Sequence, residues 1–313
     1  MILSASRRTD IPAFYSEWFL KRLQEGMVLV RNPMNFHQVS RIALSPTNFE
    51  CVVFWSKNPE PMLQRLTAVD DLGYHYYFLF TLTPYDAGIE VNVPEVEKRI
   101  ALFQTLAEKL GKARVIWRYD PILFTDHHTT NFHAAAFSKI AAQLAGFTEK
   151  CIVSFVEMYR KCTRNLQGVG LCHPSAEERM GLLRTLQTIA AANNIVLQTC
   201  AAGMDLEKAG ITPGKCIDDQ LIIKITGSGI RAEKDKNQRR ECGCIASIDI
   251  GAYNSCPHGC LYCYANNDQI SVAHNFAAHN PNGDLLCGTI DSDDKITDRG
   301  VRRLAQKQLQ FFS

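Results

Sequence analysis

Apolar and polar residues follow two recurring patterns along the first two hundred residues. Short runs rich in β-branched and aromatic residues predict buried strands. Longer stretches with apolar residues three and four positions apart predict amphipathic helices. The predicted strands are Ile2–Ser6, Cys51–Ser56, His75–Leu82, Arg114–Tyr119, Cys151–Val156 and Ile195–Thr199, and the predicted helices are Ser16–Gln24, Pro61–Ala68, Pro94–Leu110, Asn131–Leu144 and Ala176–Ala192.

Residues at the element boundaries support these assignments. Ser16 is the predicted N-cap of the first helix, because its hydroxyl can accept from a free amide of the first turn. Gly26 and Gly111 follow helices, as C-terminal glycines commonly do. The segments Met27–Arg31 and Gln38–Leu44 predict a hairpin before the second of these strands.

Six successive strand–helix units predict a parallel sheet with helices packed outside it. We therefore expect an α/β fold in which residues 1–200 form a partial (β/α)6-like barrel of the TIM type. Residues 201–313 are expected to form a cysteine-rich region and a terminal helix, Val301–Phe312, that close the mouth of the barrel. A doubly wound dinucleotide fold is disfavoured, because no G-x-G-x-x-G follows the first strand.

Charge and hydropathy narrow the class of protein. The net charge of +2 is too small to favour a dedicated duplex-DNA binder. No signal peptide is recognised, and no apolar run approaches the ~18 residues of a membrane span. We expect a cytoplasmic protein that does not associate with membranes.

Eight of the twelve cysteines are concentrated in one part of the chain, between Cys200 and Cys287. Disulfides are not expected in a reducing compartment. The scattered Cys51, Cys151, Cys162 and Cys172 are interpreted as buried small hydrophobic residues. Five of the others fall between Cys242 and Cys263, which indicates a metal centre.

The segment Cys256-Pro257-His258-Gly259-Cys260-Leu261-Tyr262-Cys263 has the form C-x3-C-x2-C. Its three soft thiolates suit an iron–sulfur cluster, and three ligands for a four-iron cluster leave one iron open. A structural zinc site usually has four closed ligands, commonly as two C-x2-C pairs, and only Cys287 follows here. The spacing therefore favours a [4Fe-4S] cluster over zinc, and His258 is expected to face solvent.

This spacing resembles the signature of the radical S-adenosylmethionine (SAM) superfamily, including the aromatic residue before the last cysteine, here Tyr262. The resemblance implies that the open iron binds SAM, that Tyr262 contacts its adenine, and that an external donor of the flavodoxin or ferredoxin type supplies electrons. It also implies reductive cleavage of SAM, which starts radical chemistry on an unknown small-molecule or modified-biopolymer substrate. The chain departs from the superfamily in two ways. The motif comes late instead of after the first barrel strand, and Ser56-Lys57-Asn58-Pro59 stands where a glycine-glycine-glutamate pattern is usual.

The whole chain resembles a bacterial group known as domain-of-unknown-function family 1848. A weaker similarity links it to spore photoproduct lyase, a DNA-repair member of the radical SAM superfamily. The family resemblance rests on the strings Ser4–Pro12, Val53–Pro59, Trp117–Pro121 and Asp249–Asn266, and the weaker one on Trp117–Pro121 and Cys256–Cys263.

Polar residues at the predicted strand ends are candidates for the rest of the site, since ligands of such folds bind there. Arg118 is the candidate for the SAM carboxylate, because guanidinium pairs bidentately with carboxylates. The candidates for the ribose are Thr81, Thr83 and Ser154, those for substrate or proton handling are Asp120 and Glu157, and Arg7, Arg8 and Asp10 are expected on the substrate side.

A second cysteine set, Cys200, Cys216, Cys242 and Cys244, lies on predicted loops. Four thiols could hold a second [4Fe-4S] cluster, could hold zinc, or could stay unliganded, and we favour them in that order. Two other functions stay open: a non-catalytic zinc or iron–sulfur protein with a nucleic-acid partner, and a photoproduct-lyase-like repair enzyme. The small net charge does not favour a nucleic-acid partner.

Overall fold

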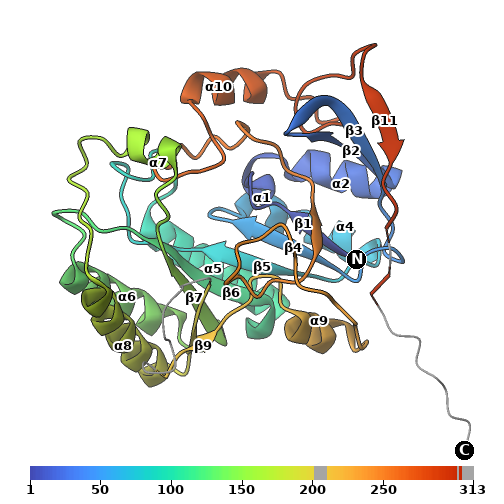
Figure 1. The fold of residues 1–313 in the computed structure, drawn as a ribbon. Helices are drawn as coiled ribbons and strands as arrows, with labels where there is room; N and C mark the ends of the chain where they lie inside the picture. The colour runs from blue at the N-terminus through green and yellow to red at the C-terminus, as the bar shows by residue number, and fades with distance from the viewer. Residues whose placement is uncertain (201–209, 302, 305–313) are drawn as a thin grey trace, which may run out of the picture.

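The computed structural model describes residues 1–200, 210–301, 303 and 304. Their main feature is an eight-stranded sheet in the order β10-β1-β4-β5-β6-β7-β8-β9, in which every neighbouring pair is parallel (Figure 1). The sheet is open, with β10 at one edge and β9 at the other. Its strands are β1 (Ile2–Ala5), β4 (Cys51–Ser56), β5 (Tyr76–Thr81), β6 (Val115–Ile122), β7 (Lys150–Phe155), β8 (Val196–Thr199), β9 (Thr212–Pro213) and β10 (Ser247–Asp249).

A smaller sheet has the order β11-β3-β2 and lies beside α2 (Figure 1). Its strands are β2 (Met27–Asn32), β3 (Asn35–Ala43) and β11 (Lys295–Asp298). The helices are α1 (Ile11–Phe14), α2 (Ser16–Glu25), α3 (Glu60–Leu63), α4 (Leu66–Asp71), α5 (Val96–Leu110), α6 (Thr130–Leu144), α7 (Arg160–Asn165), α8 (Ala176–Ala192), α9 (Asp219–Thr226) and α10 (Gln269–Ala277), with a 3-10 turn, η1 (Lys112–Arg114).

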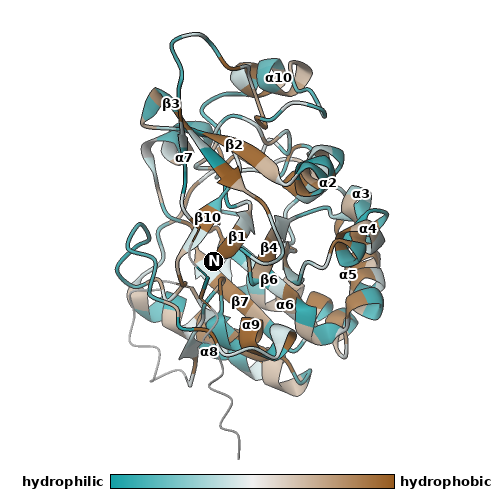
Figure 2. Cartoon of the chain, turned by 90° about the vertical axis from the view of Figure 1, so that its right-hand side faces the viewer, coloured by the Kyte–Doolittle hydropathy of each residue, from teal (hydrophilic) through white to brown (hydrophobic). Residues whose placement is uncertain are grey.

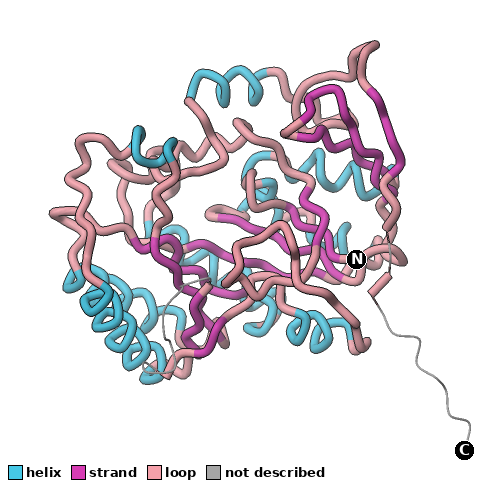
Figure 3. Tube along the Cα trace, viewed as in Figure 1, coloured by secondary structure: helices cyan, strands magenta, loops and turns pink. Residues whose placement is uncertain are grey.

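The two faces of the large sheet are covered differently. Successive side chains of a strand point to opposite faces, so Val52 and Phe54 of β4 join the apolar core formed with α2, α5, α6 and α8. Cys51, Val53 and Trp55 face the other way and pack with α9 and the segment around it. Figure 3 shows that this second cover is mostly loop, and Figure 2 shows hydrophobic central strands beneath hydrophilic outer loops.

Aromatic rings pack against one another on the first face, both between strands and against a helix. The ring of Phe54 stacks on Phe78 of β5 at 4.7 Å, and the ring of Trp117 stacks on Phe137 of α6 at 4.5 Å. All four side chains are fully buried. Burial of each such side chain stabilises the fold by roughly 1.5–3 kcal/mol, so these contacts make the sheet a rigid support for its loops.

The α/β class is confirmed, and so are the six predicted strands and the hairpin. A TIM-type barrel is not confirmed, because the sheet is open. The sequence did not predict β9 and β10, which are only two and three residues long. Two local predictions were wrong: Tyr15 rather than Ser16 is the N-cap of α2, and Pro61–Ala68 contains parts of two helices, α3 and α4. The predicted terminal helix falls largely outside the described residues. Among those residues, no helix is long and apolar enough to cross a bilayer.

Candidate functional site

The C-x3-C-x2-C loop, residues 256–263, follows β10 and lies beside the end of β1. Strand β10 pairs with β1 so that Asp249 is opposite Ser4. The Asp249 carboxylate accepts from the Ser6 hydroxyl at 2.6 Å and from the Arg7 amide at 2.8 Å. Gly251 follows in close contact: a Cβ there would lie 2.0 Å from the Ser6 oxygen. The loop is therefore attached to the carboxyl edge of the parallel sheet, where such folds bind ligands.

The segment after β5 holds the loop from its other side. Glu90 and Cys260 form an antiparallel bridge, and the Leu261 amide donates to the Ile89 carbonyl at 3.0 Å. Asn92 extends this contact, because its backbone amide donates to the His258 carbonyl at 2.9 Å. These backbone bonds fix the path of the loop.

The three thiols of the loop lie close enough to influence one another's pKa. Burial raises the pKa of Cys256 to about 12, and it also raises the pKa of Cys260 and Cys263. The Lys57 ammonium acts in the opposite direction on Cys260 and Cys263. Lys57 is thus a cation that favours thiolates at two positions of this loop, and Lys161 acts in the same direction on Cys263.

Lys57 belongs to a buried charged network behind the loop. Its Nζ lies 2.7 Å from Oε1 of Glu90, which also accepts from the Thr83 hydroxyl at 2.6 Å and from the Tyr262 hydroxyl. Arg99 Nη1 lies 3.5 Å from the other oxygen of the Glu90 carboxylate. Burial alone would raise the pKa of Glu90, but Lys57 and Arg99 hold it below its ordinary value. Glu90 is therefore a buried anion that positions Lys57 and Tyr262.

His258 does not face solvent, as the sequence suggested, but is buried. Its Nε2 atom is 2.7 Å from a carboxylate oxygen of Asp10, in the loop after β1. Asp10 thus supports the cysteine loop, whereas it was expected on the substrate side. Arg8, expected there too, pairs with Asp249 at 3.1 Å.

A second group of predicted residues gathers at the ends of β6 and β7. Arg118 pairs with Asp120, and Asp120 accepts from the Ser154 hydroxyl. The Arg118 Nη1 atom lies 3.5 Å from the Thr81 hydroxyl. Glu157 does not join this group, because it is exposed and pairs with Arg239. The structure thus brings four of the predicted residues together, while Thr83 belongs to the Glu90 network.

Arg118 and Arg7 lie next to the second cysteine set. Both guanidinium groups face the Trp55 ring, with their central carbons 4.8 Å and 5.3 Å from its centroid. Arg118 is close enough to Cys200 and Cys216 to affect their ionisation, and Arg7 interacts with the thiols of Cys216 and Cys244.

The four thiols of the second set are buried and contact one another. Hydrogen bonds with Cys216 and Cys242 lower the pKa of both Cys200 and Cys244, and the same contacts raise the pKa of Cys216 and Cys242. None of the four is in a disulfide. Among the described residues, no group of three or more His, Cys, Asp or Glu side chains is arranged to hold a single metal ion.

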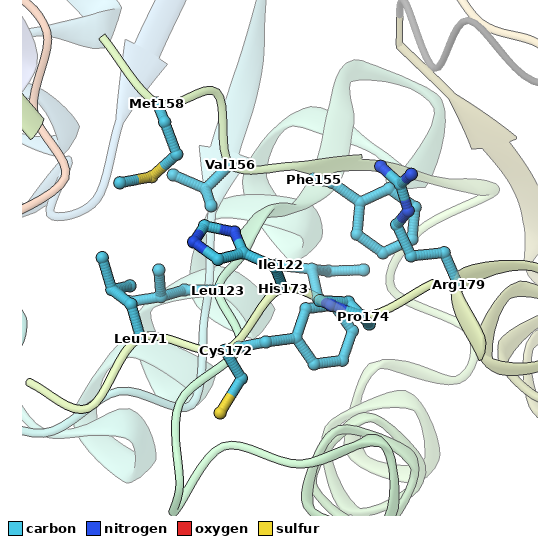
Figure 4. Close-up of a pocket in the computed structure, with 11 residues that line it drawn as sticks. Ile122, Leu123, Phe155, Val156, Met158, Leu171, Cys172, His173, Pro174 and Arg179 are labelled. Carbon is cyan, nitrogen blue, oxygen red and sulfur yellow. The ribbon is translucent and has the colours of Figure 1, made fainter. Parts of the chain in front are cut away.

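A cavity of about 180 Å³ opens at the ends of β6 and β7, between these strands and the segment before α8 (Figure 4). Its lining residues Leu123, Val156 and Leu171 belong to the apolar cluster that also contains Leu261 and Tyr262 of the cysteine loop. Arg179 borders the cavity beside Phe155, as Figure 4 shows, and its Nε has no hydrogen-bond partner. A further cavity of about 370 Å³ borders Gly259 and Cys260 themselves.

A family model described as a domain of unknown function, DUF1848, matches residues 2–265. The chain belongs to the DUF1848 family. The resemblance noted in the sequence is thereby confirmed, and the match includes both cysteine sets of this DUF1848 protein. No curated protein matches it significantly.

Sequence reasoning missed two acidic residues of the DUF1848 site, Glu90 and Asp249, and gave a third, Asp10, a different role. Glu90 is an isolated acid in a loop, and no spacing connects it with Lys57 or Tyr262. Asp10 and Asp249 lie in strings that carried the family resemblance, but their roles depend on which strands are neighbours. The only available signal was that each follows or ends an apolar run.

Proposed function

We propose that this protein is a radical SAM enzyme in which Cys256, Cys260 and Cys263 hold a [4Fe-4S] cluster. The observation that carries the proposal is the position of the C-x3-C-x2-C loop. It lies at the carboxyl edge of a parallel sheet, its three thiols come from one eight-residue loop, and the positive charge of Lys57 acts on two of them.

The chemistry of the loop fits such a cluster. Three soft thiols from one turn suit iron, and three ligands leave one iron free for the amino and carboxylate groups of SAM. Gly259 has a φ of +69°, which L side chains rarely adopt, and a Cβ there would make a tight contact of 3.2 Å with the Val91 Cβ, so the turn favours glycine. When bound, the cluster would supply the electron that cleaves SAM into methionine and a 5′-deoxyadenosyl radical.

The surrounding residues suggest how SAM would be oriented. Lys57 replaces Arg118 as our candidate for the SAM carboxylate, because Lys57 neighbours Cys260 and Cys263. Glu90 would hold Lys57 and Tyr262 in place, with Tyr262 against the adenine. The cavity of about 180 Å³ is the candidate substrate site, with Asp120 and Ser154 at the ends of the same two strands.

The late position of the motif also fits the proposal. In the superfamily the motif follows the first barrel strand, and here it follows β10, which precedes β1 in the spatial order of the sheet. The chain order is therefore permuted relative to the usual arrangement. On this proposal the open sheet is a partial barrel of the TIM type.

The test uses full-length protein reconstituted anaerobically with iron and sulfide, then treated with dithionite and SAM. We expect 5′-deoxyadenosine from the wild type, loss of product and of cluster iron in Cys260→Ala, and retention of both in Cys51→Ala. Cys51 is a matched control, because it is buried in β4 outside both sets. A wild-type protein that binds about four irons at this loop but never cleaves SAM contradicts the proposal.

A further inference from the structure

We propose that Cys200, Cys216, Cys242 and Cys244 hold a second iron–sulfur cluster, separate from the one at Cys256–Cys263. A four-cysteine set can ligate every iron of a [4Fe-4S] cluster, so this centre would have no open iron. The choice of a cluster over zinc rests on the proposed function, whereas the existence of a metal centre does not.

The four side chains form a closed ring of contacts. Cys200 contacts Cys216 and Cys242, and Cys244 contacts the same two thiols. The exposed fractions are 9%, 2%, 5% and 2% for Cys200, Cys216, Cys242 and Cys244, so solvent barely reaches the ring. Four thiols from three separate chain segments have thus been brought to one buried position.

Hydrogen bonds to the backbone hold each segment in place. The Cys200 amide donates to the Val153 carbonyl at 2.9 Å, which continues the pairing of β8 with β7. The Tyr77 hydroxyl donates to the Cys216 carbonyl at 2.7 Å. The Asp235 amide donates to the Cys244 carbonyl at 2.9 Å. These bonds fix the three segments that carry the four cysteines on the sheet face that α9 and the loops around it cover.

The positive charges next to the four cysteines favour a metal–thiolate centre over a group of neutral buried thiols. Arg7 and Arg118 both face the Trp55 indole and interact with thiols of the second set, and each has a buried nitrogen without a hydrogen-bond partner, Nη2 and Nε respectively. The partners of the other nitrogens, Asp120 and Thr81 for Arg118 and Ser247 and Asp235 for Arg7, leave these two nitrogens unused.

A buried guanidinium N–H without an acceptor is costly even when the rest of the group is paired, because no hydrogen bond replaces its lost hydration. Beside a metal–thiolate centre such an N–H gains an anionic partner, since four thiolates outweigh the positive charge of the metal core. The two arginines therefore indicate that the ring carries negative charge when loaded.

A direct chain of contacts connects the two cysteine sets. Tyr264 follows Cys263, and its hydroxyl donates to the Arg7 carbonyl at 2.8 Å. The Arg7 side chain in turn interacts with Cys216 and Cys244. A redox-active cluster at this position can exchange electrons with the first site, whereas zinc has no redox chemistry.

The experiment uses the full chain, anaerobically reconstituted with ferrous iron and sulfide, with iron, sulfide and zinc counted per chain. We expect about eight irons in the wild type and in Cys51→Ala, and about four in the triple variant Cys256→Ala/Cys260→Ala/Cys263→Ala. We also expect about four in the double variant Cys242→Ala/Cys244→Ala. After dithionite, the triple variant should keep the electron paramagnetic resonance signal of a reduced cluster.

Two outcomes overturn the inference. One is a folded triple variant that binds neither iron nor sulfide. The other is about one zinc per chain that survives in the triple variant and disappears in the double variant. The triple variant decides the matter even if the double variant fails to fold, because it retains all four cysteines. Absence of 5′-deoxyadenosine from the wild type would contradict the proposed function alone, since these metal counts do not depend on it.

Discussion

The Nε2 atom of His258 lies 2.7 Å from the Oδ2 atom of Asp10, and this contact joins the cysteine loop to the end of the first strand. The same carboxylate accepts from the Ser56 hydroxyl and the Lys57 amide, both at 2.7 Å. It also caps α1 through the Ala13 amide at 3.0 Å. One carboxylate thus fastens β1, β4 and the loop together.

Replacing Asp10 with alanine should lower the free energy of unfolding by about 3 kcal/mol, because it leaves several buried donors without an acceptor. Urea denaturation measures the change. Asp71→Ala, at an exposed position at the end of α4, should change it by less than about 0.5 kcal/mol. Equal losses in the two variants would contradict this role of Asp10.

Gly251→Ala should destabilise the fold and reduce the iron retained at the first cysteine set. The new Cβ would meet the Ser6 side chain at 2.0 Å and 2.7 Å, and the Thr9 hydroxyl at 2.9 Å. Overpacking of this kind costs about 1–3 kcal/mol. Gly229→Ala is the matched control, since nothing lies within 4 Å of a Cβ there. Thermal unfolding and iron analysis would reveal wild-type behaviour if the contact were unimportant.

The Lys57–Glu90 ion pair should contribute far more to the free energy of unfolding than a surface ion pair of similar N–O distance. Its N–O distance is 2.7 Å with side chains 12% and 0% exposed, while Lys98 and Glu60 are 2.8 Å apart and 57% and 49% exposed. Lys57→Met should cost about 3 kcal/mol, because it removes the closer of the two cations that face the buried Glu90 carboxylate. Lys98→Met should cost less than about 1 kcal/mol. Chemical denaturation of the two variants compares them directly.

His133 should make stability fall in mildly acidic solution. It is buried between the Tyr119 hydroxyl at 2.9 Å and the Leu123 carbonyl at 3.0 Å, and burial lowers its pKa to about 4. Between about pH 6.5 and pH 4 the unfolded chain binds a proton on this side chain and the folded chain does not. The free energy of unfolding should therefore decrease by about 3 kcal/mol from pH 7 to pH 4 on this account.

The variant His133→Gln should have a correspondingly flatter pH profile, and His75→Gln, at an exposed position, should keep the wild-type slope. Urea titrations at several pH values measure both. Parallel profiles for the wild type and His133→Gln would show that another group controls the acid sensitivity.

Local patterns predicted much of the fold, because buried parallel strands are continuous apolar runs. Cys51–Ser56 was predicted with its observed bounds. The order of strands was not predictable in the same way. Strand β10 has three residues, too few for any periodic signal, yet its pairing with β1 decides where the cysteine loop lies.

The candidate site likewise contains residues that local sequence patterns indicate and residues that only the folded structure brings together. Clustered cysteines are visible in the sequence, so both sets could be proposed as metal ligands from it, and both stay predictions. Glu90 and Asp10 act through contacts between distant segments, and no local pattern encodes such contacts. Arg118 was recognised as a strand-end cation, but its proximity to Cys200 and Cys216 depends on the curvature and pairing of the sheet.

The late position of the cysteines in the chain affects how the metal centres would be assembled. Strands β1 to β8 end by residue 199, whereas the seven cysteines proposed as ligands start at Cys200. Since chains form structure from the N-terminal side during synthesis, the central strands leave the ribosome before any ligand does. Zinc fingers fold only when the metal arrives. Here iron and sulfide would meet a scaffold that is already assembled, and their insertion becomes the final stage of biogenesis.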